Sequence, residues 1–469
     1  MYNAYITRIK NLHKHPNADR LQIGECFGNA VVVSMEYEDN QLGIYFPSDG
    51  KLSMEFAEAN NLLRKKDENG NNIGGYMDPE KRNVTAIKLR GEKSDGLFLP
   101  LKSLETFGDI TTLNEGDRID TFNGHLICEK YIPRRNVRQG HPSDGNRTRK
   151  KKAPISPLFS EHADTEQLAY NLGAFKPGDE IEITLKMHGT SQRTGYLPVL
   201  KGYKKTLLDR ILRKDGTPIY DWGYVSGTRR TVLEDFDGGY YGSNEFREAH
   251  SKFFEGKLHK GEEIFYEVVG FTHTGTPIMA SGDNKKLNDK DFVKQYGETT
   301  VFSYGCEPTG VRTLYGCDDE GAFSIEENVP QSAIYVYRMT MTNEDGFTVE
   351  YTPDFMRHRC EQMGVQCVPV MWRGTIPEES NLPYMDNDKT AVCSAGEWIK
   401  FVAENHYDGP DPIGKTHIRE GVVVRIINRP KFAAYKHKNW SFKALSGIAV
   451  AQAEENGVES LTDDILSEM

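Results

Sequence analysis

The chain carries the sequence KMHGTS at Lys186–Ser191, directly after the run Glu180–Leu185, in which polar and apolar residues alternate. Alternation of this kind is typical of a half-buried strand, and Gly189 permits a tight turn, so Lys186 is expected at a strand end. A free lysine amine has a pKa near ~10.4 and becomes a useful nucleophile only through burial or neighbouring cations. A surface lysine before a turn has the same local sequence, so the interpretation depends on other segments.

Two later apolar segments each carry one carboxylate. Glu267 interrupts Ile264–Phe271, and Glu420 opens the β-branched run Gly421–Ile427. Burying a charge is costly unless the charge meets a cation or a hydroxyl, so both glutamates are expected to have such partners. A core strand with an acid at its rim is the alternative interpretation of each segment.

A pair of lysines follows Glu420. Lys436 and Lys438 lie within Tyr435–Lys443, and on a strand they share one face. Two like charges on one face repel each other unless an anion lies between them, so this face is a candidate anion site. A solvated edge strand is the alternative.

Together, these segments resemble the motifs of the covalent nucleotidyltransferase superfamily, which comprises ATP-dependent DNA and RNA ligases and mRNA capping enzymes. The match is closest to the RNA ligases. The resemblance implies that Lys186 becomes adenylated, that Glu267 contacts the nucleotide ribose or the metal, and that Glu420 positions magnesium. Lys436 and Lys438 resemble the paired lysines of the fifth motif, and Lys-x-Lys-Asn followed by an aromatic residue is especially similar to phage RNA ligases.

Further positions extend the resemblance. Arg229 resembles the basic residue that follows the lysine motif, with Arg230 as the alternative. Tyr337 resembles the aromatic residue that stacks on adenine, although an aromatic pair across two strands has the same pattern. His188 stands where most of the superfamily has Asp, as it does in some phage RNA ligases, so the role of that carboxylate is not carried over. Related RNA ligases have basic residues just before the lysine motif, where this chain has His162, and no role is carried over there either.

The resemblance implies three groups of site residues and two cofactors. The catalytic residues are Lys186, Glu420, Lys436 and Lys438. The nucleotide-binding residues are these four together with His188, Gly189, Arg229, Glu267 and Tyr337, and the metal ligands are Glu420 and Glu267. The cofactors are ATP, which gives a lysine-AMP intermediate, and Mg²⁺ or Mn²⁺.

The function implied is that of an ATP-dependent RNA ligase that joins 3′-OH and 5′-phosphate RNA ends through an adenylated 5′ end, in RNA repair. Its partner is expected to be a nicked duplex or a broken structured RNA. A DNA ligase or a guanylyltransferase shares the same lysine chemistry and is one alternative. A non-catalytic RNA-end-binding protein is the other, although such a protein has no need for the full set of lysines and glutamates.

The expected fold class is α+β, with an N-terminal OB-like β-barrel followed by a nucleotidyltransferase domain of ATP-grasp-like antiparallel sheets with flanking helices. Residues 1–132 contain short alternating runs separated by Gly, Asn and Asp, which is the pattern of a small barrel. His15–Leu21 and Lys88–Pro100 resemble the N-terminal OB module of RNA ligases with this domain order. We therefore expect residues 1–132 to bind nucleic acid.

The rest of the chain is expected to form three parts. These are a basic linker over 133–156, the adenylyltransferase domain over 157–445 and an acidic, helical tail over 446–469. DNA ligases and capping enzymes have an OB module after the fifth motif, and this chain ends too soon after Lys443 to contain one.

The net charge of -11 is unexpected for a protein that binds nucleic acid, because phosphate binding relies on Lys and Arg. The basic residues are concentrated, however, in two clusters: Arg134, Arg135, Arg138, Arg147, Arg149 and Lys150–Lys152, and then Lys201, Lys204, Lys205, Arg210, Arg213 and Lys214. The clusters predict a local phosphate-binding track. A solvated linker is the alternative for the first cluster.

Composition is that of a large water-soluble enzyme. The 469 residues suffice for two or three domains, and a mean hydropathy of -0.61 without a long apolar stretch argues against a membrane span. The seven cysteines include no CxxC pair, so neither a disulfide framework nor a zinc site is predicted. We expect a cytoplasmic monomer that does not bind membranes.

Overall fold

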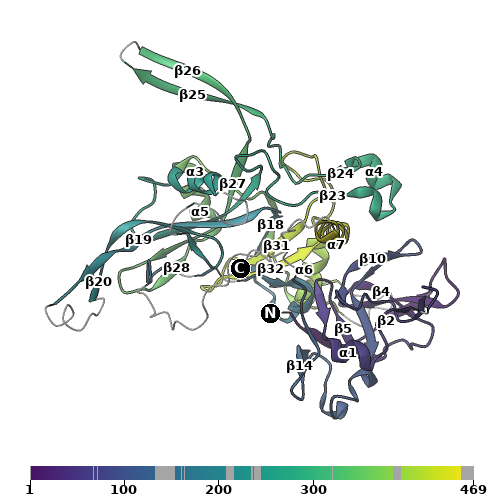
Figure 1. Cartoon of the computed structure of the whole chain (residues 1–469). Helices are drawn as coiled ribbons and strands as arrows, with labels where there is room; N and C mark the ends of the chain where they lie inside the picture. The colour runs from purple at the N-terminus through teal and green to yellow at the C-terminus, as the bar shows by residue number, and fades with distance from the viewer. Residues whose placement is uncertain are drawn as a thin grey trace. The chain divides into compact units, whose positions relative to one another are not determined.

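The computed structural model describes most of the chain (Figure 1). The described residues are 2–66, 68–70, 72–132, 154–159, 161–162, 164–206, 216–233, 236, 244–318, 321–383 and 392–455. The predicted basic linker at 133–156 lies outside these residues apart from 154–156, and so does the predicted tail beyond 455. Of the second basic cluster, only the three lysines at 201–205 are described.

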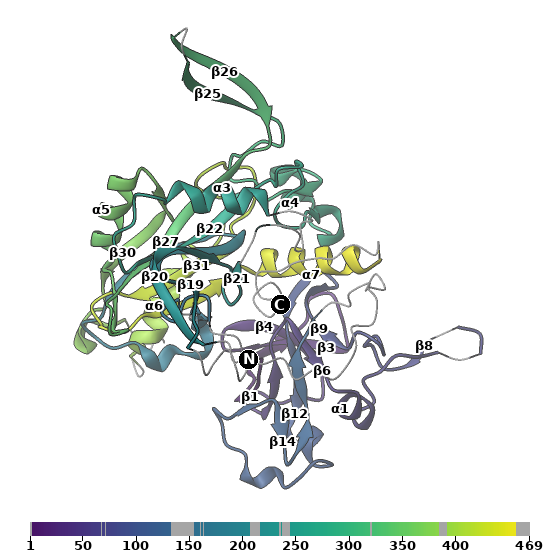
Figure 2. The same cartoon turned by 60° about the vertical axis from the view of Figure 1, so that its left-hand side comes forward.

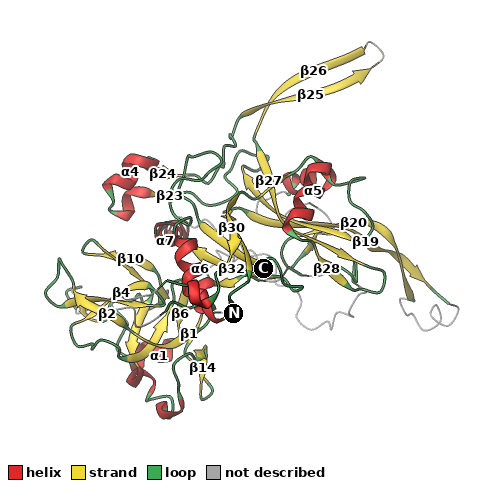
Figure 3. Ribbon diagram, turned by 180° about the vertical axis from the view of Figure 1, so that it is seen from behind, coloured by secondary structure: helices red, strands yellow, loops and turns green. Residues whose placement is uncertain are grey.

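The chain folds into two compact units. The smaller unit comprises Met1–Arg135, Gly282–Thr299 and Trp440–Ser460, and the larger comprises Asn136–Ser281, Thr300–Asn439 and Leu461–Met469. Both units combine helices with mainly antiparallel strands, as the colouring in Figure 3 shows. The α+β fold class is therefore confirmed.

Antiparallel pairing organises the smaller unit into small sheets. One sheet has four strands, in the order β12 (Leu97–Pro100), β5 (Leu42–Phe46), β1 (Ala4–Arg8), β13 (Arg118–Ile119). A second sheet has the order β2 (Lys10–Lys14), β3 (Leu21–Cys26), β4 (Asn29–Ser34). A third has the order β16 (Cys128–Lys130), β6 (Gly50–Leu52), β9 (Asn83–Val84). The two-stranded pairs are β7 (Lys65–Lys66) with β8 (Asn72–Gly74), β10 (Ala86–Leu89) with β11 (Glu92–Asp95), β14 (Thr121–Phe122) with β15 (His125–Leu126), and β23 (Gly282–Asp283) with β24 (Thr299–Thr300). These described strands close no single barrel, so the OB-like barrel stays a prediction.

The core of the smaller unit lies under β1 and β5. Ala4 and Ile6 of β1 and Ile44 and Phe46 of β5 are fully buried, together with Phe56 of helix α1 (Met54–Ala59). The core residues named on each strand are two apart, because alternate side chains point to opposite faces. The other face of β5 is covered too, since Tyr45 is also fully buried.

Helices from two distant parts of the chain complete the smaller unit. Helix α7 (Trp440–Glu455) is held by an ion pair of 2.5 Å between Lys443 Nζ and Asp95 Oδ2, and the Lys93 amine lies over the Trp440 ring. At helix α4 (Lys290–Tyr296), Lys88 Nζ lies 2.8 Å from the carboxylate of the capping residue Asp289. The segment Lys88–Pro100 therefore contacts both helices.

Two larger sheets organise the larger unit. The first has the order β17 (Glu166–Gln167), β32 (Ala433–Lys438), β31 (Gly421–Ile426), β18 (Glu180–Lys186), β30 (Val370–Thr375). The second, visible in Figure 2, has the order β21 (Val232–Leu233), β20 (Thr217–Gly227), β19 (Thr190–Lys204), β22 (Glu262–Gly270), β27 (Ser332–Thr342), β28 (Thr348–Glu350), with β29 (Gln366–Cys367) also beside β27. The remaining elements include the hairpin β25 (Gly310–Asp318) and β26 (Gly321–Val329) and the helices α3 (Glu245–Phe253), α5 (Pro353–Met363) and α6 (Ala395–Glu404).

The first sheet has one apolar face. Ile181 and Ile183 of β18 pack with Val422 and Val424 of β31 and with Ile399 of α6, and all five are fully buried. Because side chains alternate along a strand, the intervening residues of β18 and β31 face away from α6. The opposite face of this sheet therefore carries Lys186, at the end of β18.

The second sheet is arranged in the same way. Ile264, Tyr266 and Val268 of β22 pack against Phe246 of α3 and Met356 of α5. Glu267 lies between two of these buried residues and so faces away from the helices. Each sheet thus presents polar residues on the face that its helices leave open.

Candidate active site

Three neighbouring strands bring charged residues together. The sheet register aligns Lys186 of β18 with Gly421 of β31, and Gly421 with Lys438 of β32. Glu420 directly precedes Gly421, and its Oε1 lies 2.9 Å from Lys186 Nζ and 3.3 Å from Lys438 Nζ. The Nδ1 of His188 lies 3.4 Å from the other carboxylate oxygen, Oε2. Four residues from three separate segments of the sequence therefore form one cluster.

Glu420 is a buried carboxylate in this cluster, with a side chain that is 2% exposed. Burial alone would raise the pKa of Glu420, but the charges of Lys186 and Lys438 and a hydrogen bond from His188 hold that pKa well below its ordinary value. Glu420 is therefore ionised at neutral pH. A carboxylate that pairs with two amines holds them close together, where both can contact an incoming phosphate.

Glycine is required at two positions beside the cluster. A Cβ on Gly189 would collide with the carbonyl oxygen of Val268 in β22, so a side chain there would push the lysine turn off that strand. Gly421 has a φ of 149°, and a Cβ there would collide with the carbonyl oxygen of His437. Both glycines allow neighbouring backbone to approach the residues of the cluster closely.

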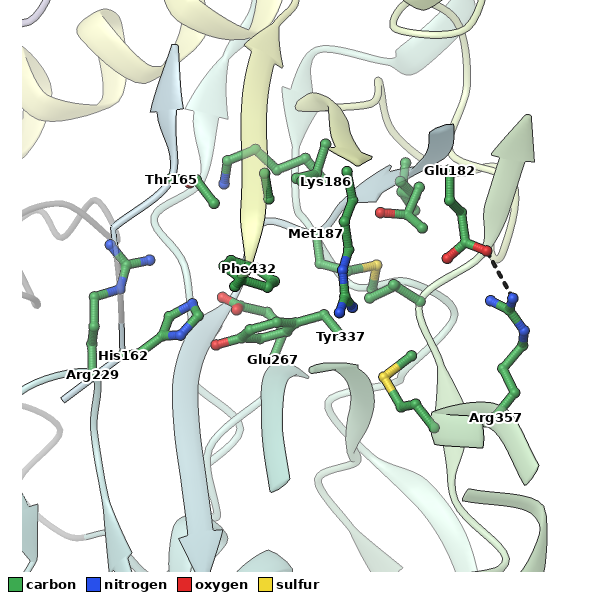
Figure 4. Close-up of a pocket in the computed structure, with 17 residues that line it drawn as sticks. His162, Thr165, Glu182, Lys186, Met187, Arg229, Glu267, Tyr337, Arg357 and Phe432 are labelled. Atoms are coloured by element: carbon green, nitrogen blue, oxygen red, sulfur yellow. Dashed lines mark hydrogen bonds and ion pairs between the residues drawn. The ribbon is translucent and has the colours of Figure 1, made fainter. Parts of the chain in front are cut away.

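A pocket opens beside Lys186 (Figure 4). The predicted site residues that line it are Lys186, Arg229, Glu267 and Tyr337. Lys436 and Lys438 lie on the same face of β32 as Ala434, which also lines the pocket. The pocket thus adjoins the sheet face that carries the lysine pair.

Of the two candidate arginines, Arg229 and Arg230, the first faces the pocket. Asp164 forms ion pairs with both candidates, at 3.3 Å to Arg229 Nη1 and 2.9 Å to Arg230 Nη2. The Arg229 side chain is 15% exposed and lines the pocket, whereas that of Arg230 is 39% exposed. The first choice from the sequence therefore lies at the site.

Glu267 and Tyr337 come from neighbouring strands of the second sheet. Glu267 of β22 lies opposite Ser191 of β19, and the Ser191 hydroxyl lies 2.8 Å from the Tyr337 hydroxyl of β27. Glu267 is buried, yet it borders the pocket. Three adjacent strands thus fix the positions of these side chains.

His162 is a pocket residue to which the sequence assigned no role. Its ring centroid lies 5.1 Å from that of Phe265 and 5.3 Å from that of Tyr337, and its Nδ1 lies 3.0 Å from Nη1 of Arg338. Burial, and then the charges of Arg338 and Arg229, hold the pKa of His162 well below its ordinary value. Arginine can only donate, so Nδ1 accepts, and the neutral ring carries its proton on Nε2.

Glu182 and Phe432 also line the pocket and were not predicted from the sequence. Glu182 lies on the same face of β18 as Lys186 and forms an ion pair of 2.7 Å with Arg357 of α5, drawn as a dashed line in Figure 4. The Phe432 ring borders the pocket, and the Arg338 guanidinium lies 4.6 Å from its centroid. Alternation along β18 could have identified Glu182, whereas nothing in the local sequence marks Phe432.

The acidic residues near Lys186 fit a metal ion that has few protein ligands. Within the described ranges, no group of three or more His, Cys, Asp or Glu residues is arranged to hold a metal. Mg²⁺ keeps several waters and is usually bound by one or two carboxylates together with substrate phosphates, so Glu420 and Glu267 form a suitable donor set.

The fold is similar to that of solved RNA ligase structures from Naegleria gruberi. A mutant of that ligase with AMP and Mn matches with a TM-score of 0.50 and 14% identity, over 93% of this chain and 96% of that chain. A mutant with ATP and Mn has a TM-score of 0.48 at 14% identity, and the ligase with PPi has 0.48 at 15%, both with the same coverage. No protein-family model and no curated protein sequence matches the chain.

The first of these matches shows that the chain has the fold of an RNA ligase. The similarity extends over both units, because it covers nearly the whole length of each protein. As for membranes, none of the helices in the described part of the chain has the length and apolar character needed to span one.

Proposed function

We propose that this protein is an ATP-dependent RNA ligase that uses Lys186 as its nucleophile. The observation that carries the proposal is the cluster of Lys186, Glu420 and Lys438, which lies beside a pocket bordered by Arg229 and Glu267. A structural lysine has no need for a buried carboxylate shared with a second lysine at the edge of a pocket. The fold of the Naegleria gruberi RNA ligase with AMP and Mn supports the same conclusion.

The proposed reaction has three transfer steps. First, the neutral amine of Lys186 attacks the α-phosphorus of ATP, so an N–P bond forms, the bond to the bridging oxygen breaks and pyrophosphate leaves, while one amine proton passes to water. Next, the 5′-phosphate of an RNA end attacks the lysine-bound AMP and releases the lysine. Finally, a 3′-hydroxyl attacks the 5′-phosphate, and AMP leaves. Positioning and charge stabilisation dominate such transfers, because little other covalent chemistry is required of the protein.

The cluster supplies the electrostatics of the first step. Glu420 holds Lys186 and Lys438 together before ATP arrives, and the triphosphate then competes with Glu420 for these cations. Lys438, together with Lys436 on the same face of β32, stabilises the negative charge that develops on the phosphate. A divalent metal held by Glu420 and Glu267 would neutralise part of this charge when bound.

The rest of the pocket positions the nucleoside. Tyr337 and Phe432 offer aromatic surfaces for the adenine, and Glu267 offers a carboxylate for the ribose hydroxyls or the metal. Arg229 adds positive charge at the pocket edge. His188, which stands where related enzymes have aspartate, contacts Glu420, so its proposed role is to orient that carboxylate.

RNA with 3′-OH and 5′-phosphate ends is the proposed substrate, as a nicked duplex or a broken structured RNA in a repair reaction. The smaller unit is proposed to bind this RNA through an OB-type module, a fold that binds oligonucleotides. Two observations support this proposal. His15–Leu21 and Lys88–Pro100 resemble such modules, and the similarity to the Naegleria gruberi RNA ligase fold extends over both units.

The test is covalent labelling of the purified protein with α-labelled ATP or GTP in the presence of Mg²⁺. We expect a label from ATP that pyrophosphate reverses, that Lys186→Ala abolishes, and that the exposed-lysine control Lys176→Ala retains. Absence of label from both nucleotides, with RNA still bound, would overturn the ligase assignment in favour of an RNA-end-binding protein. A label from GTP alone would indicate a guanylyltransferase.

A further inference from the structure

Tyr304 has an unusual backbone conformation for a bulky residue. Its φ is 49° and that of the following Gly305 is 82°, within a turn closed by a hydrogen bond of 2.9 Å from the Cys306 amide to the Ser303 carbonyl oxygen. Glycine, asparagine and aspartate are the usual residues in this left-handed region, and a tyrosine there is strained. Such strain persists only where surrounding contacts hold the residue in place.

The surroundings of Tyr304 supply those contacts. The side chain is buried, and its ring lies edge-on to the ring of His417 at 4.5 Å. The loop before His417 is itself fixed, because the Asp411 carboxylate accepts hydrogen bonds from the backbone amides of Ile413 and Gly414. A Cβ on Gly414 would lie 2.6 Å from the Gly305 nitrogen, so this loop packs directly on the strained turn.

The hydroxyl of Tyr304 reaches the turn that carries the nucleophile. It accepts a hydrogen bond of 2.6 Å from the backbone amide of His188, two residues after Lys186. Burial raises the pKa of Tyr304, and the nearby carboxylates Glu420 and Glu267 raise it further. The neutral hydroxyl thus lies near both proposed acidic residues while it holds the backbone of the lysine turn.

We propose that Tyr304 is a positioning residue that fixes the turn Lys186–Gly189 relative to Glu420. This inference rests on the proposed function, in which Lys186 must be placed in line with the α-phosphate. The strain at Tyr304 is retained because a tyrosine at this turn brings a hydroxyl to the His188 amide. Errors of about 1 Å in the placement of reacting groups can slow a reaction by roughly a hundredfold, so a single hydrogen bond to this turn is significant.

The test compares Tyr304→Phe with the matched variant Tyr351→Phe. Tyr351 is also buried in the larger unit, and its hydroxyl lies 3.0 Å from a carboxylate oxygen of Glu262, away from the pocket. At saturating ATP, Tyr304→Phe is expected to slow Lys186 labelling by roughly tenfold or more, with ATP affinity within about twofold of wild type. Tyr351→Phe is expected to label at the wild-type rate. Equal rates for wild type and Tyr304→Phe would overturn the inference, and so would a loss that only follows the folded fraction measured by thermal unfolding.

A second measurement separates this inference from the proposed function. Amide hydrogen exchange of the peptide that contains Met187–Gly189 does not depend on activity. We expect faster exchange in Tyr304→Phe than in Tyr351→Phe, because only the first variant loses the acceptor for the His188 amide. If wild type takes no label, faster exchange still supports the positioning of the turn by Tyr304, and unchanged exchange rejects it.

Discussion

Lys186 Nζ lies 2.9 Å from Glu420 Oε1, across the neighbouring antiparallel strands β18 and β31. The two residues are far apart in sequence, and only the register of the sheet brings them together. Because Glu420 also lies 3.3 Å from Lys438 Nζ, one carboxylate neutralises part of the charge of two amines. The site is therefore preorganised before any nucleotide binds, and its charge balance shifts once a triphosphate enters.

Replacement of Glu420 by glutamine tests this preorganisation. The Glu420→Gln variant keeps the shape of the side chain but leaves Lys186 and Lys438 to repel each other, so both amines are expected to leave their positions. We expect labelling by ATP to slow by roughly a hundredfold, as is found when one electrostatic group of an active site is removed. Initial rates of label incorporation measure the effect. Glu248→Gln, which removes a surface ion pair on α3, is the control and should label normally.

Arg229 and Arg230 offer a matched pair of substitutions. Both contact Asp164, but only Arg229 lines the pocket. Arg229→Ala is therefore expected to weaken ATP binding by roughly tenfold, the effect of losing one charge-assisted contact, while Arg230→Ala changes it by less than about twofold. Calorimetric titration with ATP on the Lys186→Ala background avoids turnover. Equal losses in both variants would mean that the contact with Asp164, rather than the pocket, explains the effect.

His250 is expected to make stability depend on pH. Burial, with a contribution from Arg247, lowers the pKa of His250 to about 4, and its Nε2 lies 2.8 Å from the Ser332 hydroxyl. Between pH 4 and about 6.5, His250 is protonated in the unfolded chain but neutral in the folded protein. The contribution of the neutral His250 to the free energy of unfolding is therefore complete above pH 6.5 and is lost as the pH falls towards 4. Its full size is about 3 kcal/mol.

Urea unfolding of wild type and His250→Gln at several pH values measures this contribution. The glutamine keeps a polar group near Ser332 but does not titrate. The difference in unfolding free energy between the two proteins should therefore change between pH 6.5 and 4.5 and be constant from pH 7 to 8. A difference that is independent of pH throughout would show that His250 is not buried as a neutral ring.

The sequence predicted the central residues of the site because their positions follow local patterns. Alternation along Glu180–Leu185 placed Lys186 at a strand end, and the cost of burying Glu420 among β-branched residues required a cation or a hydroxyl as its partner. The structure supplies that partner in Lys186 and Lys438. Strand periodicity and charge burial are both readable from a few adjacent residues.

Other site residues could not be predicted because their contacts join distant loops. His162 and Tyr304 lie in irregular segments without a repeating pattern, and their roles depend on Arg338 and on the His188 amide, respectively. That helices α4 and α7 belong to the smaller unit could not be predicted either, for the same reason. These helices are joined to the rest of the unit by ion pairs over long sequence distances, such as that between Lys443 and Asp95.

His162 is expected to select the base of the nucleotide. Its Nδ1 accepts a hydrogen bond from Arg338, so Nε2 carries the proton and the ring is a hydrogen-bond donor. If adenine stacks on Tyr337, whose ring centroid lies 5.3 Å from that of His162, we expect this donor to face the edge of the base. The N1 of adenine is an acceptor, so it can bind the His162 donor. The N1 of guanine is a donor, so guanine and His162 would place two donors against each other and leave both without an acceptor.

The variant His162→Phe keeps an aromatic ring but removes the Nε2 donor, together with the Nδ1 acceptor of the Arg338 hydrogen bond. We expect it to lower the preference for ATP over GTP by roughly fivefold, because loss of one neutral hydrogen bond corresponds to about 1 kcal/mol. The ratio of kcat/KM for labelling with ATP and with GTP measures this preference. Met356→Leu changes another pocket residue without altering its hydrogen bonding, and it should keep the wild-type ratio. An unchanged ratio in His162→Phe would show that the base is selected by other groups, and that His162 serves only to position Arg338.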